Sequence, residues 1–433
     1  MSYDSVRMGE QMRILDFSID EFINRYNLFT LEAELLGVVP ARQTLILLPG
    51  GMASKLRRAK KAWDPAGPAS QIFKYDIVFG DVPALLGGAA RDLRMHKTAA
   101  GEYRDKGNRV VIADGVIDLF GISPYLLFTA WCSFKQIDWF VWPWDWRRSV
   151  DEVGTFFVDR FLSHFQERVA TDCNNADPLA DYSLIGHSAG GMVVNWLLRN
   201  VDPLPGTIRK VITVAAPFYG YGRQLHRWFE GEPLVNGGGA FTNGIIKALS
   251  SFPACYSWNF LPLEFYEANQ ALFQNDDPAY RLASYPSVDL APPNDPVDTY
   301  APQPPGQRYP TFAQTGFDND ELSKARTLFD ALTSPLSPAQ AAMFVNIRGD
   351  TTANNTLDTT TWKLLPPISP SPIADTSLTP GDSVQPAWST RDVGLLNQVP
   401  GNVITVKGGD TSHMFIMDSP KTIAQLAAVL GIP

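Results

Sequence analysis

The pentapeptide Gly186-His187-Ser188-Ala189-Gly190 decides the fold of this chain, because a strand-like run precedes it and a helix-like run follows it. The strand-like run is Tyr182 to Ile185, and the helix-like run is Met192 to Asn200. A serine on a sharp turn between a strand and a helix needs small residues two positions away on each side, and glycine occupies both positions. We therefore expect a nucleophile elbow that presents the Ser188 hydroxyl to a cleft.

Short β-rich runs alternate with helical patterns along the chain, which is typical of a mostly parallel sheet covered by helices on both faces. A long amphipathic helix is expected over Val150 to Val169, and a final helix is expected to begin at Ser419-Pro420. The sequence thus predicts an α/β fold. Besides the run before Ser188, the expected strands are Thr44 to Leu48, Val110 to Ala113, Ile137 to Val141, Val211 to Ala215, Met343 to Ile347 and Val403 to Val406.

Proline and aromatic residues divide this pattern into three parts. From Phe218 to about Asp320 the chain is rich in aromatic residues and then in prolines, which cannot lie inside helices or central strands. We predict a first part of the core over residues 1–217 and a second part over 321–433. Residues 218–320 are predicted to form an inserted cap or lid, with Gly237-Gly238-Gly239 as its hinge.

The length, composition and net charge of the chain fit a large globular protein and argue against a nucleic-acid-binding protein. The chain has 433 residues, 45% of them hydrophobic, and a net charge of -9. This length can bury a large core, while the acidic balance argues against a nucleic-acid partner, since phosphate binding needs clustered cations. The basic run Lys55 to Lys61 is interpreted as a local solvated face.

The cysteines, the N-terminal residues and the apolar runs indicate where in the cell the protein is expected. Cys132, Cys173 and Cys255 are widely spaced and are interpreted as buried thiols, without a disulfide framework or metal site. The first twenty or so residues lack the plan of a signal peptide. No apolar run reaches the ~18 residues that a spanning helix needs. We expect an intracellular or already processed protein, cytoplasmic in location, that needs no cofactor or metal.

A serine hydroxyl needs a base to take its proton and an acid to orient that base. After an elbow of this kind the acid and then the histidine follow along the chain. His413 comes after the last expected strand and is the predicted base. His187 adjoins the serine, so its ring is expected to have a structural role. The remaining histidines precede the serine or lie in the predicted cap: His96, His164 and His226.

Two aspartates compete for the role of the acid. Asp350 comes directly after the strand expected at Met343 to Ile347, and Asp382 lies in a loop further along. Position alone favours Asp350 narrowly and leaves both open. The weaker candidates, interpreted as solvated loop carboxylates, are Asp358, Asp375 and Asp410.

Several motifs in combination resemble the lecithin:cholesterol acyltransferase family, which includes the lysosomal phospholipase. The resemblance runs from about residue 44 to the C-terminus. It implies an α/β-hydrolase fold with a cap and a mobile lid, and acyl-ester chemistry on lipid-like substrates. The motifs are Pro49-Gly50-Gly51-Met52, Trp144-Asp145-Trp146-Arg147, the elbow at Ser188, Ala215-Ala216-Pro217 with Gly220, Gly381-Asp382 through Trp388-Ser389, and His413.

The resemblance also implies roles for individual residues. Ser188 becomes the nucleophile, His413 the base and Asp382 the acid, which overrules the choice made on position. The oxyanion hole falls on the backbone amides of Gly51 and Ala189. Such amides suit this role because they are fixed before the reaction begins.

Two further features of the resemblance affect the interpretation. Asp145 and Arg147 are interpreted as a structural ion pair or hydrogen-bond network rather than as catalytic groups. The chain departs from the family at Ala189, where a larger apolar residue is common, and at Ser383-Val384-Gln385. The cysteines that pin the lid in extracellular members have no counterparts, so a secreted lipoprotein enzyme is not expected.

The predicted function is a serine-dependent acyl-ester hydrolase of lipase, phospholipase or esterase type that works through an acyl-enzyme. Water is the expected acceptor, because an alcohol would need a dedicated pocket to compete with it. One alternative is an acyltransferase with an alcohol acceptor, and another is a catalytically silent hydrolase-fold binding protein. The expected partners are a lipid-like ester and, peripherally, a membrane surface. The oligomeric state is left open.

Overall fold

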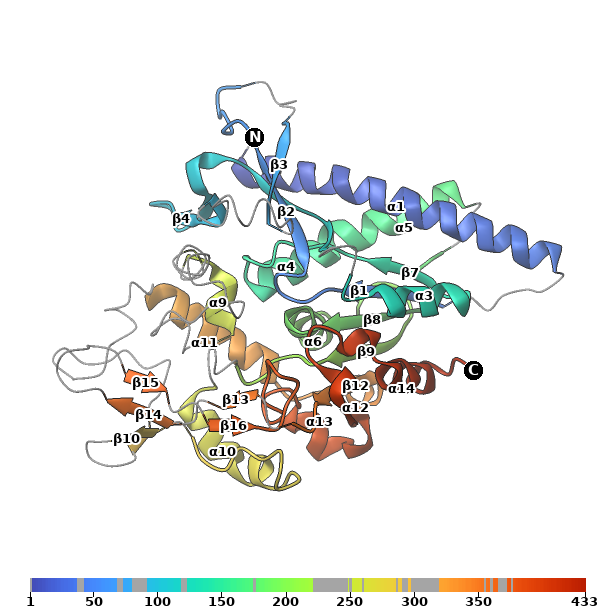
Figure 1. Ribbon diagram of the computed structural model, residues 1–433. Helices are drawn as coiled ribbons and strands as arrows, with labels where there is room; N and C mark the ends of the chain where they lie inside the picture. Colours follow the sequence, from blue (N-terminus) through green and yellow to red (C-terminus); the bar gives the residue numbers. More distant parts are fainter. Residues whose placement is uncertain are drawn as a thin grey trace. The chain divides into compact units, whose positions relative to one another are not determined.

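A computed structural model shows how the chain folds (Figure 1). The chain forms two compact units, Met1–Thr213 with Ile423–Pro433, and Val214–Thr422. The residues that the structure describes are 2–36, 43–67, 73–79, 92–117, 123–173, 177–220, 248, 251–258, 261–285, 287–289, 295–296, 319–353, 356–358, 361–364, 372–374 and 377–433.

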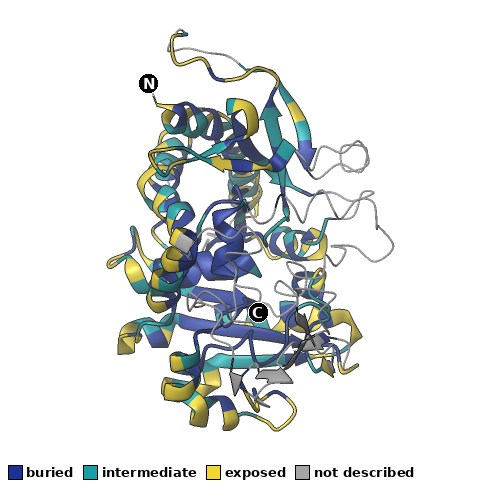
Figure 2. Ribbon diagram, turned by 90° about the vertical axis from the view of Figure 1, so that its left-hand side faces the viewer, coloured by how far each residue is buried: buried dark blue, intermediate teal, exposed yellow. Residues whose placement is uncertain are grey.

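A sheet with strands in the order β9, β8, β1, β7 forms the centre of the first unit. These strands are β1 (Thr44–Leu48), β7 (Asp138–Val141), β8 (Tyr182–His187) and β9 (Ile208–Val214). Strand β1 runs parallel to β7 and to β8, with Ile46 opposite Phe140 and Leu184. Every residue of β1 and β8 is buried, and these strands are dark blue in Figure 2. Burial on both faces explains why β1 is apolar from Leu45 to Leu48 instead of alternating.

Helices pack around this sheet. They are α3 (Leu126–Phe134), α4 (Val150–Phe156), a π-helical segment η3 (Phe157–Leu162), α5 (Ser163–Asp172) and α6 (Ala189–Asn200). The helix expected from Val150 is therefore present, with a π-helical interruption. Helix α4 packs on α6 at Gly154, where an added Cβ would lie only 2.4 Å from Cε3 of Trp196.

The N-terminal helix α1 (Tyr3–Leu35) is not predicted by the sequence pattern. It contacts β7, α5 and β6, and it buries Leu15, Ile19 and Phe22. Its other face exposes Phe17, Leu28 and Leu31 as well as charged residues, so the two faces differ little in polarity. A weak contrast hides an amphipathic helix from pattern analysis.

The run expected as a strand at Val110 to Ala113 belongs to a different sheet. Strand β6 (Val111–Val116) pairs antiparallel with β2 (Ser54–Ala59), which pairs antiparallel with β3 (Tyr75–Phe79). This corrects its expected place in the parallel sheet, because a strand's own residues do not specify its partner. The basic run from Lys55 forms most of β2, where Arg57 pairs with Asp114. A hairpin of β4 (Met95–Lys97) and β5 (Tyr103–Asp105) and the 3-10 turn η2 (Lys106–Asn108) complete this region.

The second unit contains a parallel pair of strands, β12 (Phe344–Asp350) and β17 (Val403–Lys407), with Ile347 opposite Ile404. Ala215, which follows β9, donates its N–H to the Ile347 carbonyl at 2.8 Å. The helices are α9 (Pro253–Ser257), α10 (Leu263–Gln274), α11 (Asn319–Thr333), α12 (Pro338–Met343) and α13 (Val393–Gln398).

Short elements complete the chain. The strands are β10 (Ser287–Asp289), β11 (Asp295–Pro296), β13 (Thr356–Asp358), β14 (Thr361–Leu364), β15 (Pro372–Ala374) and β16 (Ser377–Thr379). The 3-10 turns are η5 (Pro400–Asn402), η6 (Gly409–Thr411) and η7 (Ile416–Asp418). The final helix α14 (Pro420–Leu430) begins at Pro420, as the sequence predicts.

Much of the predicted cap, including the hinge Gly237-Gly238-Gly239, lies outside the described residues. Its described aromatic residues pack with one another, for example Tyr219 against Phe273 with ring centroids 5.0 Å apart. Phe265 packs on Phe329 at the same separation. The division into a two-part core and a cap stays a prediction.

The fold class follows from these elements. Parallel strands with intervening helices, and a serine at the turn between β8 and α6, give the chain an α/β-hydrolase fold. Cys132, Cys173 and Cys255 are buried thiols, in agreement with the prediction of burial. Among the helices of the described residues, none combines the length and apolar character needed to cross a membrane.

Candidate active site

Ser188 occupies the turn between β8 and α6 with φ 52° and ψ -125°. A non-glycine residue in such a conformation carries backbone strain of about 1–3 kcal/mol. The backbone turns so sharply that neither Gly186 nor Gly190 has room for a side chain. A Cβ at Gly186 would lie 2.4 Å from the Gly190 carbonyl oxygen, and one at Gly190 would lie 2.2 Å from the Leu48 carbonyl oxygen. This is the geometry of the predicted elbow.

Tyr125 connects the elbow to the loop after β1. Its hydroxyl lies 2.9 Å from Nδ1 of His187 and accepts the Gly50 N–H at 2.9 Å. The ring of His187 is buried and therefore has the structural role expected of it. Tyr125 itself escaped sequence analysis, because an isolated tyrosine in an irregular run carries no signal of a distant partner.

The two predicted oxyanion amides follow neighbouring parallel strands. The register of β1 and β8 places Leu48 opposite Gly186, so the loop at Gly50 and the Ser188 turn lie side by side. A Cβ at Gly50 would lie 3.2 Å from Cβ of Ser188. Gly51 comes next in that loop, and Ala189 is the first residue of α6. The N–H of a first helical residue has no acceptor within its helix and lies at the positive end of the helix dipole.

Two tryptophan side chains donate hydrogen bonds to the backbone on either side of Gly51. The indole N–H of Trp144 donates to the Pro49 carbonyl at 2.8 Å. The indole N–H of Trp146 donates to the Ser54 carbonyl at 3.2 Å. The loop that carries Gly51 is thereby fixed at both of its ends.

In the second unit, Asp382 and His413 form a carboxylate–imidazole pair. Nδ1 of His413 lies 2.7 Å from Oδ2 of Asp382, and the His413 backbone N–H donates to the Asp382 carbonyl at 2.7 Å. Oδ1 of Asp382 accepts the N–H groups of Val384 at 3.0 Å and Gln385 at 2.6 Å. The Asp382 side chain is 1% exposed and that of His413 is 12% exposed. The carboxylate is therefore held by backbone groups and oriented toward Nδ1.

The loop around Asp382 needs unusual backbone. A Cβ at Gly381 would lie 2.3 Å from the Gln385 carbonyl oxygen, and Ser383 has φ 76°. The Ser383 N–H donates to Oγ1 of Thr356 at 2.9 Å. Thr356 thus supports the loop, although nothing in the sequence indicates this role.

Asp350 has other partners. Its Oδ2 accepts the Tyr280 hydroxyl at 2.5 Å, and its Oδ1 accepts the Thr352 N–H at 2.8 Å. Within the described residues the Asp350 carboxylate thus binds Tyr280 and Thr352 rather than a histidine, which does not support the preference based on position. Asp410 accepts the Ser419 hydroxyl at 2.7 Å, and Asp375 lies outside the described residues.

The other histidines lie elsewhere. His96 is exposed on β4, and Nε2 of His164 contacts the carboxylate of Asp16. His226 lies outside the described residues. In the described parts of the chain, no group of three or more His, Cys, Asp or Glu side chains is placed to hold a metal ion.

Asp145 and Arg147 form a buried ion pair, as expected. The Arg147 Nε and Nη2 groups donate to the two Asp145 carboxylate oxygens at 2.8 Å each, and Nη1 lies 2.7 Å from Asp105 Oδ1. Burial raises the pKa of the Asp145 carboxyl, but the charge and hydrogen bonds of Arg147 outweigh it and lower this pKa from 3.8 to about 2. Asp145 therefore stays ionised in the folded protein.

Replacing Asp145 with asparagine is expected to lower the free energy of unfolding by about 3 kcal/mol near neutral pH, because one partner of a buried pair is lost. The folded pKa lies below the unfolded one, so this contribution is complete above the unfolded pKa and disappears as the pH falls through the folded pKa. The difference between wild type and variant should therefore shrink between pH 4 and pH 2, as measured by urea unfolding at a series of pH values.

The matched control is Asp181→Asn, which removes a more exposed partner of Arg209. Its effect on the free energy of unfolding is expected to be below about 1 kcal/mol. A pH-independent loss for Asp145→Asn, or a loss no larger than that of the control, would contradict a structural ion pair.

Comparisons with known proteins do not assign the chain to a family. No protein-family model matches the chain, and no curated protein sequence matches it. Among solved structures it is similar to a chain of the Tle4–Tli4 complex at 13% identity and TM-score 0.48, covering 91% of this chain and 98% of that one. It is similar to the product of gene lin2722 from Listeria innocua at 12% identity and TM-score 0.31, covering 90% and 94%. It is similar to a pyrethroid hydrolase from Sphingobium faniae JZ-2 at 12% identity and TM-score 0.25, covering 91% and 99%. Since these TM-scores lie below 0.5, the fold assignment depends on the chain's own strands and turn.

Proposed function

We propose that this protein is a serine-dependent acyl-ester hydrolase. Ser188 is the nucleophile, His413 the general base, Asp382 the acid that orients it, and the amides of Gly51 and Ala189 the oxyanion hole. The observation that carries the proposal is the strained backbone of Ser188, at the turn that follows the parallel strand β8. Such strain lowers stability and is typical of functional sites, and here it falls on a residue with a hydroxyl group.

The Asp382–His413 pair supports this assignment chemically. The carboxylate accepts a hydrogen bond at Nδ1, which leaves the Nε2 lone pair available to accept a proton. The proposal requires Nε2 of His413 to come within hydrogen-bond reach of the Ser188 hydroxyl.

The proposed reaction has two halves. Oγ of Ser188 bonds to the ester carbonyl carbon while His413 takes the hydroxyl proton, and the negative carbonyl oxygen accepts hydrogen bonds from Gly51 and Ala189. The ester C–O bond then breaks as His413 returns the proton to the leaving alcohol. Water next attacks the acyl-enzyme, gives a proton to His413 and displaces Ser188, which recovers that proton as the carboxylic acid leaves.

A lipid-like ester is the proposed substrate. The resemblance to the lecithin:cholesterol acyltransferase family supports this class. In the first unit Leu126 and Leu127, which follow Tyr125, are 51% and 53% exposed, and in the second unit Met414 and Phe415, which follow His413, are 53% and 42% exposed. Exposed apolar side chains next to functional residues suit an apolar substrate or a membrane surface.

The experiment that tests the function is labelling with a fluorophosphonate, followed by mass spectrometry of the labelled peptide. We expect one adduct, on Ser188, and hydrolysis of p-nitrophenyl esters that the adduct blocks completely. An adduct on another serine would overturn the assignment of the nucleophile. Neither labelling nor ester turnover would favour the silent binding protein.

The choice between hydrolysis and acyl transfer is decided by the product. The enzyme is given a p-nitrophenyl ester with and without an added long-chain alcohol. A hydrolase converts the same fraction of the acyl groups to free acid in both cases. Formation of the new ester as the main product would instead assign the acyltransferase alternative, which requires an acceptor pocket.

A further inference from the structure

The hydroxyl of Tyr125 lies between the loop after β1 and the elbow at Ser188. It accepts the Gly50 N–H at 2.9 Å, and it lies 2.9 Å from Nδ1 of His187. Tyr125 is 1% exposed, and its ring packs edge-on against that of His187 with centroids 5.7 Å apart. A hydroxyl that accepts one hydrogen bond keeps its own proton, which is available for a ring nitrogen that carries none. The phenol therefore links Gly50 to the residue directly before Ser188.

The peptide unit between Pro49 and Gly50 is bound at both of its polar groups. Its N–H is that of Gly50, which donates to Tyr125. Its carbonyl is that of Pro49, which accepts the indole N–H of Trp144 at 2.8 Å. Trp144 is 2% exposed, so both partners are buried side chains. Because a peptide unit is planar, hydrogen bonds at its two opposite sides fix the direction of the whole plane.

The amide proposed for the oxyanion hole, that of Gly51, belongs to the next peptide unit. The carbonyl of this unit, on Gly50, accepts the Ala53 N–H at 3.0 Å across a turn. The N–H and C=O of a trans peptide point in opposite directions, so the Gly51 N–H points away from Ala53. Gly50 is buried, whereas Gly51 is half-buried. The Gly50 N–H is thus occupied inside the protein, which agrees with the choice of Gly51 as the donor to a substrate.

This turn carries backbone strain, so its direction depends on support from the surrounding structure. Met52, which follows Gly51 in the turn, has φ 65°, a conformation that favours glycine. Such strain persists only where neighbouring groups hold the chain in place. Tyr125 and Trp144 supply this support at the peptide unit before the turn, and we call these two side chains the peptide clamp.

We propose that Tyr125 is a positioning residue for the ester hydrolysis. Together with Trp144 it keeps the Gly51 N–H directed at the negative oxygen that develops beside Ser188. This inference rests on the proposed function, because the direction of that amide matters to the rate only if such an oxygen forms. Tyr125 touches no reacting atom and acts through Gly50. A misplacement of a catalytic group by about 1 Å costs up to ~100-fold in rate, which sets the scale of the expected effect.

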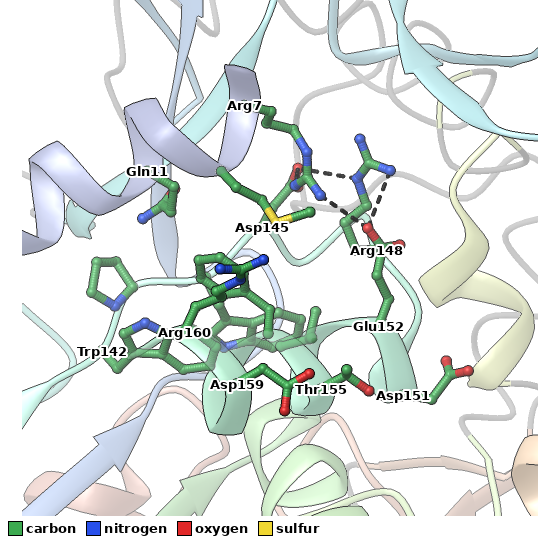
Figure 3. A pocket seen from close by; sticks show the side chains of 15 residues that line it. Arg7, Gln11, Trp142, Asp145, Arg148, Asp151, Glu152, Thr155, Asp159 and Arg160 are labelled. Carbon is green, nitrogen blue, oxygen red and sulfur yellow. Dashed lines mark hydrogen bonds and ion pairs between the residues drawn. The ribbon is translucent and has the colours of Figure 1, made fainter. Parts of the chain in front are cut away.

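Trp144 also lines a cavity of about 350 Å³ between α1, the segment from Trp142 to Arg148, and α4 (Figure 3). Among the described residues that line this cavity, none belongs to the loop 49–53 or to the elbow. A smaller ring at position 144 therefore adds to a space that already exists outside the elbow. Trp144→Phe thus removes the donor to the Pro49 carbonyl and leaves the residues around Ser188 unchanged.

Amide hydrogen exchange tests the peptide clamp without any substrate. Tyr125→Phe removes the hydroxyl and keeps the ring, so the Gly50 N–H loses its acceptor. Mass spectrometry of the peptide that spans residues 48–53 follows this amide. We expect exchange about ten-fold faster, or more, than in the wild type, because the local protection depends on that hydrogen bond. Unchanged exchange would overturn the proposal, since the phenol would then not hold the loop.

The kinetic test uses p-nitrophenyl butyrate. We expect Tyr125→Phe to lower kcat and kcat/KM alike, by between about ten-fold and ~100-fold, with KM unchanged, because the amide stabilises the transition state and not the bound ester. The matched control is Tyr182→Phe, which removes a tyrosine hydroxyl at the other end of β8, one that donates to the Pro205 carbonyl at 2.7 Å. It should shift the urea unfolding midpoint to a similar extent and leave kcat close to the wild-type value. Equal kinetic losses in the two variants would mean general destabilisation and would refute a positioning role.

A double variant tests whether the two side chains act together. If Tyr125 and Trp144 hold one peptide unit, their effects on kcat are coupled, so the loss in Tyr125→Phe/Trp144→Phe should differ from the product of the single losses. A loss equal to that product would mean that they act separately, against the proposed clamp. Wild-type protein that neither hydrolyses esters nor reacts with a fluorophosphonate would sink the proposed function itself. An active wild type whose Tyr125→Phe variant keeps its full kcat would overturn this inference alone.

Discussion

Replacing Ser188 with alanine is expected to lower ester turnover by ~10⁶-fold, the scale seen when the nucleophile of a serine hydrolase is removed. In the proposed mechanism the hydroxyl forms the bond to the acyl group, and alanine has no oxygen with which to form it. Fluorophosphonate labelling should disappear in the same variant. The measurement is hydrolysis of p-nitrophenyl butyrate and of a long-chain ester, each followed with wild type and variant.

The structure argues that this variant folds. Alanine has the same Cβ as serine, so it meets the backbone strain at φ 52° without additional crowding. Ser183→Ala is the matched control, because it removes a buried hydroxyl from β8, the strand that leads to Ser188. The Ser183 hydroxyl accepts a hydrogen bond from Gln43 at 3.2 Å. The control should keep its labelling and most of its activity. Turnover that persists in Ser188→Ala would remove this serine from the mechanism.

Asparagine at position 382 is expected to lower turnover by ~10⁴-fold, the effect of the equivalent change in the serine-protease template. The hydrogen bonds of the loop explain why. The N–H groups of Val384 and Gln385 require an oxygen at Oδ1, so the NH₂ group of the asparagine must face Nδ1 of His413. Nδ1 would then have to accept, the ring proton would move to Nε2, and the base would present a proton where it needs a lone pair.

Asp350→Asn provides the comparison. Asp350 interacts with Tyr280 and Thr352, and an asparagine oxygen can still accept one of these hydrogen bonds. We expect a loss of about 1–2 kcal/mol in the free energy of unfolding and less than about ten-fold in turnover. Values of kcat and kcat/KM for both variants, at a pH where each is folded, show which of the two aspartates acts as the acid. A larger kinetic loss at position 350 would return the role of the acid to Asp350.

Local sequence determined the parts of the protein that depend on close neighbours in the chain. The Ser188 turn could be predicted because its strand, its helix and its two glycines are contiguous. The bounds of β1 could be predicted because burial on both faces makes a strand continuously apolar. The number and spacing of the cysteines indicated thiols inside the fold, and all three are buried.

The tertiary structure alone decided matters of partnership between distant residues. Position along the chain leaves both Asp350 and Asp382 open as the acid, and the resemblance selects Asp382. The fold adds the contact itself, in which Oδ2 of Asp382 lies 2.7 Å from Nδ1 of His413. Strand β6 has the composition of a central strand, but its partner is the antiparallel β2. The cavity beside α1 brings together side chains from residues 7 to 160, most of which show no pattern in the sequence. Propensity and periodicity act over a few residues, whereas hydrogen-bond partners and cavities arise from packing between segments that are far apart in the chain.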